Sequence, residues 1–333
     1  MKKYTLDDIL LRPQYSEIRS RSEVDLTTDL GKGVVLKFPI ISSPMDTVTD
    51  VKMATRLARS GGLGIIHRYN SIARQAAAVR MASYDSNQGN VGAAVGTTGD
   101  YIERAQEVAD AGANVICIDV AHGHHIMVKE ALSELKKSLP DSVHIMAGNV
   151  ATRDGFESLQ HWGADSIRCG VGGGSACSTR IQTGHGVSNL QTLLEVTRHA
   201  TTSKIILDGG IKGAGDIVKA IAAGADAVMI GSLLAGTDAS PGEVIDGRKL
   251  YRGMASKEAQ MDWRGKASAA EGVVSSVKYV GMLEDYIEEL CGGIRSGCSY
   301  SGVRQLSELA KHAQWDYISP ATQAESRPHV LTR

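Results

Sequence analysis

The stretch VICIDVAHGHHIMVKEALSELKKSLPDSVHIMAG, from Val115 to Gly148, contains the unit that decides the fold. It opens with an apolar run, continues through a helical pattern over Ile126–Ser138 and ends on a second apolar run. Parallel strands that are covered by helices on both faces are apolar nearly throughout. The stretch therefore predicts two parallel strands, Val115–Val120 and Val143–Gly148, joined by a helix.

The same alternation continues in both directions along the chain. Six further apolar runs predict strands at Phe38–Ser43, Leu63–His67, Val91–Val95, Ser166–Gly170, Lys204–Gly209 and Ala227–Ser232. Helical patterns lie between the runs, among them Val51–Ser60, Asp100–Ala111 and Asp216–Ala223. Eight strand-then-helix units predict an α/β fold of the closed (β/α)8 barrel type. The rival, an open doubly wound sheet, is disfavoured because no glycine-rich dinucleotide fingerprint follows the first run.

The length fits one such barrel, which we expect to span residues 1–333 as a single domain. Barrels of this type take about 250 residues before insertions. Two segments break the rhythm of strands and helices. Residues 251–281 form a long polar excursion that we expect to act as a flap, and residues 315–333 form a polar C-terminal tail.

Charge and composition exclude several classes of protein. The 36 basic and 37 acidic residues nearly cancel, so no surface for nucleic acid or an anionic membrane is expected. The N-terminus lacks the apolar core of a signal peptide, and no apolar run approaches the ~18 residues of a membrane span. Five cysteines without a C-x-x-C pair argue against a disulfide framework and a zinc site. We expect a cytoplasmic protein that acts on a small molecule.

Barrel enzymes carry their chemistry on the loops that follow the strands, and Gly170–Arg180 (GVGGGSACSTR) is the most informative of these loops. Four glycines in five positions suit a loop whose backbone N–H groups crowd a ligand. Cys177 is a candidate nucleophile on this loop, and an incidental small residue in a glycine turn is the alternative. Asp208-Gly209-Gly210 and Gly231-Ser232 end neighbouring strands, where barrels often bind phosphate.

The loop Asp119–His125 adds one acid and three histidines (His122, His124 and His125). Their spacing is not the i, i+4 spacing of a helical metal site, so we expect loop polar groups or a helix start. Asp119 either hydrogen-bonds a ligand or caps the following helix. Cys117, Cys169 and Cys291 are expected to pack in the core.

Together these loops resemble the inosine monophosphate (IMP) dehydrogenase / guanosine monophosphate (GMP) reductase family, over nearly the whole chain. The motifs that carry the resemblance are PIISSPMDTVTD (Pro39–Asp50), GGLGIIHRYNSI (Gly61–Ile72), VGAAVG (Val91–Gly96), IDVAHGH (Ile118–His124), MAGNVAT (Met146–Thr152), GVGGGSACSTR, LDGGI (Leu207–Ile211), MIGSLLAGT (Met229–Thr237), YRGMAS (Tyr251–Ser256), AEGV (Ala270–Val273) and GGIRSGCSYSG (Gly292–Gly302). The family usually has Pro where Gly173 stands and Thr where Ser178 stands. Most of its dehydrogenases insert a regulatory domain pair, for which the linker Met81–Gly89 is too short.

The resemblance implies roles for individual residues. Cys177 would attack C2 of a purine nucleotide while Thr179 and Glu271 move protons. The substrate would be held by Ser43, Met45, Ser175, Asp208, Gly210, Gly231, Ser232, Tyr251, Gly253, Met254 and Ala255. A nicotinamide cofactor would lie against Asp119, Val120, Ala121, Asn149, Gly170 and Gly172. The backbone of Gly172, Gly174 and Cys177 would hold a monovalent cation such as K+, and the chain would assemble as a homotetramer.

Two activities of the family remain to be weighed. PIISSPMDTVTD, GIIHRYNSI and IDVAHGH resemble the dehydrogenases, and GGIRSGCSYSG resembles the reductases. The dehydrogenases hydrolyse a covalent intermediate with a mobile flap that carries an Arg–Tyr pair. Here 17 positions separate Met254 from Glu271, and Arg264 follows a tryptophan. We therefore expect NADPH-dependent reduction of GMP to IMP and ammonia. The alternatives are an NAD-dependent IMP dehydrogenase and a catalytically inactive nucleotide sensor.

Overall fold

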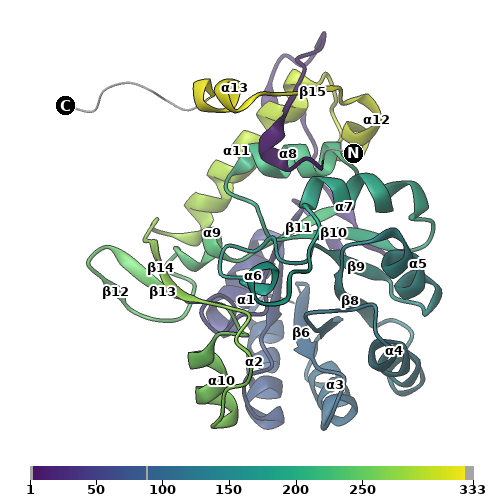
Figure 1. Cartoon of the computed structure of the whole chain (residues 1–333), viewed down its shortest axis with the longest axis vertical. Coiled ribbons are helices and arrows are strands. Elements are labelled where there is room, and N and C mark those ends of the chain that lie inside the picture. Colours follow the sequence, from purple (N-terminus) through teal and green to yellow (C-terminus); the bar gives the residue numbers. More distant parts are fainter. Residues whose placement is uncertain (1–2, 88, 327–333) are drawn as a thin grey trace.

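The structure, a computed structural model, describes residues 3–87 and 89–326. Eight parallel strands close into a barrel in chain order (Figure 1). They are β4 (Ile40–Ser42), β5 (Leu63–Ile66), β6 (Val91–Val95), β7 (Val115–Asp119), β8 (His144–Val150), β9 (Ser166–Cys169), β10 (Lys204–Asp208) and β11 (Ala227–Ile230). Each of the eight predicted strands overlaps one of these, so the predicted (β/α)8 fold is confirmed.

Several predicted strand ends were wrong by one or two residues, and turns explain them. Phe38 accepts a hydrogen bond from the backbone N–H of Ile40, so the strand begins after a turn. Gly209 has a φ of 84°, which ends β10 at Asp208. Ser232 was predicted to end the last strand, whereas it begins the short helix α9 (Ser232–Ala235).

Helices cover the outside of the barrel. They are α1 (Val51–Ser60), α2 (Ile72–Asp85), α3 (Tyr101–Asp110), α4 (Ile126–Ser138), α5 (Arg153–His161), α7 (Asn189–Val196), α8 (Ala214–Ala222) and α11 (Leu283–Tyr300). The short helix α6 (Thr179–Thr183) instead lies in the loop that follows β9. Because α9 has four residues, α11 takes the place of the eighth helix and packs between α8 and α1. Among the described residues, no helix combines the length and apolarity needed to cross a membrane.

The barrel interior is a packed core. Its apolar side chains cluster with those of a hairpin, β2 (Thr28–Asp29) and β3 (Val35–Leu36), that precedes the first barrel strand. Members of this cluster are Leu30, Val34, Leu36, Ile41, Ile65, Cys117, Met146 and Met229. Ligands are therefore expected at the carboxyl ends of the strands.

The polar excursion after β11 contains regular structure. β12 (Val244–Ile245), β13 (Arg248–Arg252) and β14 (Val274–Lys278) form an antiparallel sheet. The helix α10 (Lys257–Arg264) lies in the connection between β13 and β14. The excursion thus begins before residue 251, at β12.

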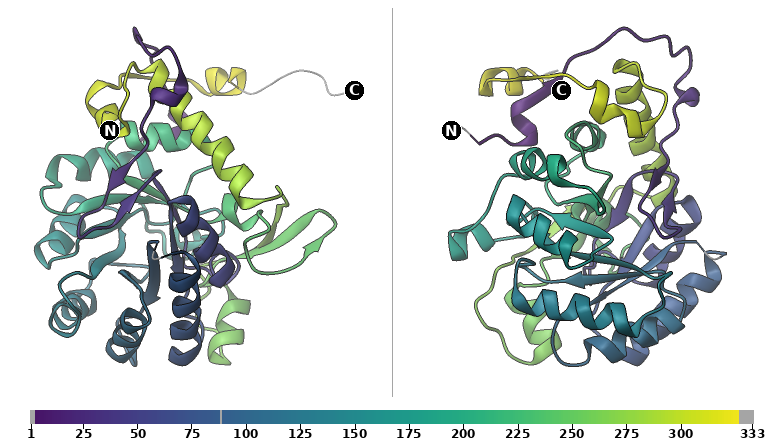
Figure 2. Two further views of the ribbon diagram at one scale, coloured as in Figure 1. Left: turned by 180° about the vertical axis from the view of Figure 1, so that it is seen from behind. Right: turned by 90° about the vertical axis from the view of Figure 1, so that its right-hand side faces the viewer.

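Segments near the two ends of the chain lie side by side (Figure 2). β1 (Ile9–Leu11) pairs antiparallel with β15 (Trp315–Tyr317), and α13 (Pro320–Glu325) follows. The remaining short elements are α12 (Leu309–His312), η1 (Leu6–Asp8), η2 (Arg21–Glu23), η3 (Thr197–His199) and η4 (Leu306–Glu308). The predicted tail therefore contains β15 and α13, and its residues 327–333 lie outside the described residues.

Candidate active site at the barrel rim

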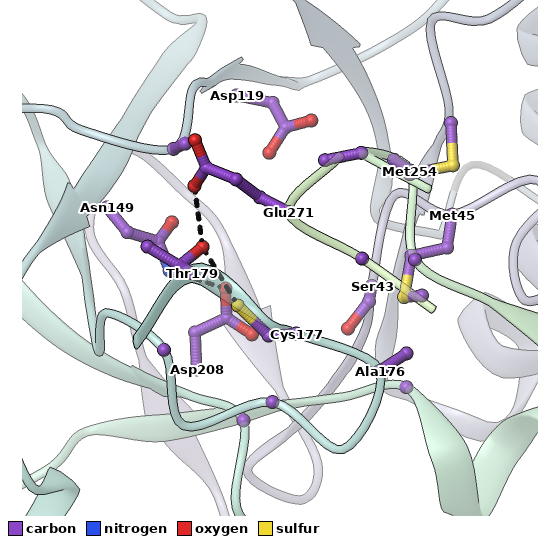
Figure 3. Close-up of a pocket in the computed structure, with 18 of the residues that line it drawn as sticks. Ser43, Met45, Asp119, Asn149, Ala176, Cys177, Thr179, Asp208, Met254 and Glu271 are labelled. Atoms are coloured by element: carbon purple, nitrogen blue, oxygen red, sulfur yellow. Dashed lines mark hydrogen bonds between the residues drawn. The ribbon is translucent and has the colours of Figure 1, made fainter. Parts of the chain in front are cut away.

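The loops after the strands enclose a cavity of about 410 Å³. Every residue that the sequence analysis selected for catalysis, substrate, cofactor or cation binding lines this cavity, and ten of its lining residues are labelled in Figure 3. The structure thus brings all of them together, while the role of each stays a prediction.

Cys177, Thr179 and Glu271 form a chain of hydrogen bonds. Cys177 Sγ donates to Thr179 Oγ1 over 3.2 Å, and Thr179 Oγ1 donates to Glu271 Oε2 over 2.8 Å (Figure 3). The five cysteines all lie in the described residues, and Cys177 alone is exposed. An accessible thiol with a hydrogen-bonded path to a carboxylate suits nucleophilic catalysis.

Backbone pairing brings these side chains together although they lie far apart in the sequence. Ser178 N donates to Glu271 O over 2.8 Å, and Val273 N donates to Ala176 O over 3.0 Å. Glu271 N in turn donates to Ala255 O over 3.1 Å. The glycine loop, the end of β13 and the segment before β14 therefore form one layer over the barrel mouth.

Glycines allow this layer to form. A Cβ on Gly253 would lie 2.8 Å from Ala176 O and 3.2 Å from Gly272 Cα. At Gly173, a Cβ would lie 2.4 Å from Asn189 Oδ1. The proline that the family usually has at this position would thus require Asn189 to move.

The buried guanidinium of Arg168 links two acids that line the cavity, Asp119 and Asp208. Arg168 Nη1 donates to Asp119 Oδ1 over 2.6 Å, and Arg168 Nη2 donates to Asp208 Oδ2 over 2.8 Å. Asn149 Nδ2 donates to the same oxygen of Asp208 over 2.8 Å. Burial lowers the pKa of Arg168. Cys117 and the two carboxylates raise it by a larger amount, so the pKa lies well above its usual value. Arg168 is therefore charged.

The histidine loop has a structural explanation. His125 Nδ1 accepts a hydrogen bond from Met127 N and caps α4, so the alternative that Asp119 caps this helix was wrong. His124 Nε2 lies 3.1 Å from Ser158 Oγ. No group of three or more His, Cys, Asp or Glu side chains within residues 3–87 and 89–326 is arranged to hold a metal ion.

The expected phosphate side of the cavity is built at β10 and β11. These strands are parallel neighbours, with Asp208 opposite Met229, so the loops that carry Gly210 and Ser232 are adjacent. Ser175 Oγ donates to Tyr251 Oη over 3.3 Å. Burial raises the pKa of Tyr251, so its hydroxyl keeps its proton and remains a hydrogen-bond donor.

Several residues of the lining were missed by the sequence analysis. They are Arg68, Tyr69, Arg168, Gln260 and Ser268. Arg168 could have been found, because a charge within an otherwise buried strand requires a partner of opposite charge. Tyr69 stacks on Trp263 of α10, with ring centroids 5.7 Å apart and an interplanar angle of 13°. No sequence pattern indicates this contact between distant segments.

Comparison with known proteins adds a decisive observation. The sequence model of the "IMP dehydrogenase / GMP reductase domain" matches residues 3–329. The chain belongs to this family. Family members are oxidoreductases of purine metabolism that use a nicotinamide cofactor, and the chain shares their barrel fold.

Among the individual relatives, some are IMP dehydrogenases and one is a GMP reductase. The inosine-5'-monophosphate dehydrogenase of Nitrosopumilus maritimus is 33% identical, with 98% of each chain covered. That of Cryptosporidium parvum is 37% identical over 98% of this chain and 95% of the relative. Among solved structures, a cysteine-to-alanine variant of Trypanosoma brucei GMP reductase in complex with guanosine 5'-monophosphate has a TM-score of 0.92. It is 29% identical, and the alignment covers 100% of this chain and 98% of that chain.

The first alignment also bears on domain content. It extends over 465 positions, and the 333 residues of this chain cannot fill them, so at least 132 positions are gaps in this chain. The barrel continues directly from α2 to β6, and the described residues contain no inserted regulatory domain pair.

Proposed function

We propose that this chain is a GMP reductase, which converts GMP to IMP and ammonia with NADPH. The observation that carries the proposal is the chain of hydrogen bonds Cys177–Thr179–Glu271, set beside a short segment that lacks the family's hydrolytic pair. Binding alone would require no such chain, which argues against an inactive nucleotide sensor.

The residues account for each bond that changes. Cys177 passes its proton through Thr179 toward Glu271, and the thiolate adds to C2 of the nucleotide. The C2–N bond then breaks, and the same hydroxyl and carboxyl return a proton to the departing ammonia. A nicotinamide held beside Asp119 and Asn149 would supply the hydride that C2 gains. Cys177 leaves C2 when the C–S bond breaks and takes up a proton again. In sum, GMP, NADPH and two protons give IMP, ammonium and NADP+.

Asn149 supports the assignment of the cofactor side. Its Oδ1 is buried without a hydrogen-bond partner in the described structure, whereas its Nδ2 donates to Asp208 and to Gly170 O. A buried acceptor without a donor is costly, and a carboxamide N–H of nicotinamide is a suitable donor. Asp119, Val120, Ala121, Gly170 and Gly172 line the cavity around it. A monovalent cation at the glycine loop and a homotetramer stay predictions from the family.

IMP dehydrogenase is the second candidate, favoured by the names of the relatives in the sequence comparison. It would require a base that activates water at C2. Arg264 lines the cavity, but Trp263 precedes it and Gly265 follows it, so the Arg–Tyr pair of the family's dehydrogenases is missing. An isolated arginine keeps its proton and is a poor base.

An absorbance assay at the reduced-nicotinamide band separates the candidates. A reductase loses absorbance with GMP and NADPH, whereas a dehydrogenase gains absorbance with IMP and NAD. Steady formation of xanthosine monophosphate (XMP), abolished by Arg264→Ala, would overturn the proposal. Ligand-dependent thermal stabilisation without turnover in either direction would identify a sensor.

A further inference from the structure

We propose that Arg168 is a positioning residue that couples binding of the nucleotide to binding of the cofactor. The inference rests on the proposed function in placing a purine nucleotide at Asp208 and a nicotinamide nucleotide at Asp119. It adds that each ligand raises the binding affinity of the other, through the guanidinium that joins these carboxylates.

Each carboxylate uses one oxygen for the internal network and leaves the other unbound. Asp208 Oδ2 accepts from Asn149 Nδ2 at 2.8 Å and from Arg168 Nε and Nη2 at 3.2 and 2.8 Å. Within the described residues, no hydrogen bond reaches Asp208 Oδ1. Asp119 Oδ1 accepts from Arg168 Nη1 at 2.6 Å, whereas Asp119 Oδ2 has only Arg68 Nε, at 4.0 Å. Both residues line the cavity, so each has one oxygen available to a ligand hydroxyl.

The guanidinium between them cannot move independently of either carboxylate. The Arg168 side chain is 7% exposed and projects from β9, whereas Asp119 ends β7 and Asp208 ends β10. Its planar group donates from three nitrogens, so a shift of one carboxylate disturbs the bonds to the other. Separating the buried guanidinium from its carboxylates would leave an unpaired charge, at a high cost in free energy. Arg168, Asp119 and Asp208 therefore stay together as a unit.

Coupling follows from this shared unit. A nucleotide hydroxyl bound to Asp208 Oδ1 orders Asp208, and with it Arg168 and Asp119. The cofactor then meets a carboxylate that is already ordered, and less conformational entropy is lost when it binds. Thermodynamic linkage requires the reverse effect to be equal, so each ligand tightens the other by the same factor.

Calorimetric titration with GMP and NADP+ tests the inference. This pair cannot react in a reductase or in a dehydrogenase, so the result does not depend on the direction of catalysis. We expect each ligand to tighten the other at least about fivefold, the lower end of the usual range of ~5–150-fold. IMP with NADH forms a second unreactive pair for the case that the enzyme is a dehydrogenase.

Arg168→Lys keeps the charge but cannot serve two carboxylates in the same plane. We expect this variant to bind each ligand alone and to show a coupling factor near one. Arg104→Lys is the matched control, because Arg104 is also buried, pairs with Asp100 and does not line the cavity. It should retain the coupling of the unmodified enzyme.

Two results would overturn the inference: independent binding in the unmodified enzyme, or full coupling in Arg168→Lys. If Arg168→Lys does not fold, Asp119→Asn removes one charge of the unit, and retained coupling in that variant also counts against the inference. Failure of the proposed function is a separate result, because the absorbance assay decides it and the coupling factor can be measured with either unreactive pair.

Discussion

At the scale of single residues, reactivity separates Cys177 from the other cysteines. Burial raises the pKa of Cys117 to about 12 and that of Cys291 and Cys298 to about 11, and it raises the pKa of Cys169 as well. Because thiolates are the reactive species, we expect iodoacetamide at pH 8 to label Cys177 and GMP to protect it. Intact-mass measurement should show one adduct on the native protein and none on Cys177→Ala.

The same substitution tests the role of Cys177 in catalysis. Cys177→Ala should bind GMP but lose turnover by at least ~10³-fold, since no covalent step remains. Near-normal turnover in this variant, or labelling that GMP does not slow, would show that the thiol is not the nucleophile.

Glu271→Gln tests the proton path. The amide oxygen can still accept a hydrogen bond from Thr179 but cannot take up a proton, and general acid–base catalysis contributes ~10²–10⁴-fold. Rapid-quench measurement should show slower ammonia release, with hydride transfer less affected. Glu258→Gln provides the control, because Glu258 is an exposed acid on α10 outside the cavity lining. Ammonia release at the unmodified rate in Glu271→Gln would remove this residue from the proton path.

Residue-scale prediction from sequence succeeds where a pattern is local. The glycine loop indicates Cys177, because four glycines in five positions have no use within a strand or helix. Arg168 was missed, since its apolar neighbours predict a buried strand and its two acidic partners lie 49 and 40 positions away. Its role depends on which strand ends meet, and only the closed barrel determines that.

At the scale of elements, the contact between α10 and the loop after β5 is the clearest test of the predicted flap. The stack of Trp263 on Tyr69 holds α10 at the cavity, and aromatic pairs contribute about 0.5–1.5 kcal/mol beyond area burial. Trp263→Ala should therefore raise the KM for NADPH about two- to tenfold, because α10 covers the bound cofactor less often. Trp263→Phe should stay close to the unmodified value. Equal KM values for all three proteins would mean that α10 does not cover the cofactor.

The barrel strands were predictable because their apolar runs repeat. In the polar excursion, the dipeptide Asp246-Gly247 indicates a hairpin turn, which the sequence analysis did not use. Asp246 and Gly247 lie between β12 and β13 with φ values of 49° and 70°, as a two-residue hairpin turn requires. Three of the five residues of β13 are charged, so the strand does not show an apolar alternation. One of them, Lys249, lies on the buried face and donates from its ammonium to the carbonyls of Thr237 and Ser240.

At the scale of the whole molecule, the pairing of the chain ends could not be predicted. β1 and β15 have three residues each and lie about 300 positions apart, so neither shows a periodicity that identifies its partner. Asp316 of β15 forms a bidentate ion pair with Arg12, which follows β1, but both are exposed, and such a pair adds little stability.

The stability of the whole barrel should fall in mild acid, because buried histidines must take up protons on unfolding. His144 in β8 is fully buried, with Nε2 2.7 Å from Ser166 Oγ, and His67 is 8% exposed. Burial lowers the pKa of both. In the unfolded chain they titrate near ~6.5, so the unfolded state binds more protons below that pH and the native state is disfavoured. The loss begins as the pH falls through ~6.5 and continues until the lowered native pKa is reached.

Denaturant unfolding at pH 7.5 and 6.0 measures this effect. Each histidine contributes at most about 1.4 kcal/mol per pH unit, and the free energy of unfolding should be lower at pH 6.0. His144→Asn should reduce the difference between the two pH values, even though the substitution lowers stability at both. His161→Asn, at an exposed position on α5, should leave the difference unchanged. Equal stability at pH 7.5 and 6.0 in the unmodified protein would mean that these rings can be protonated without opening the barrel.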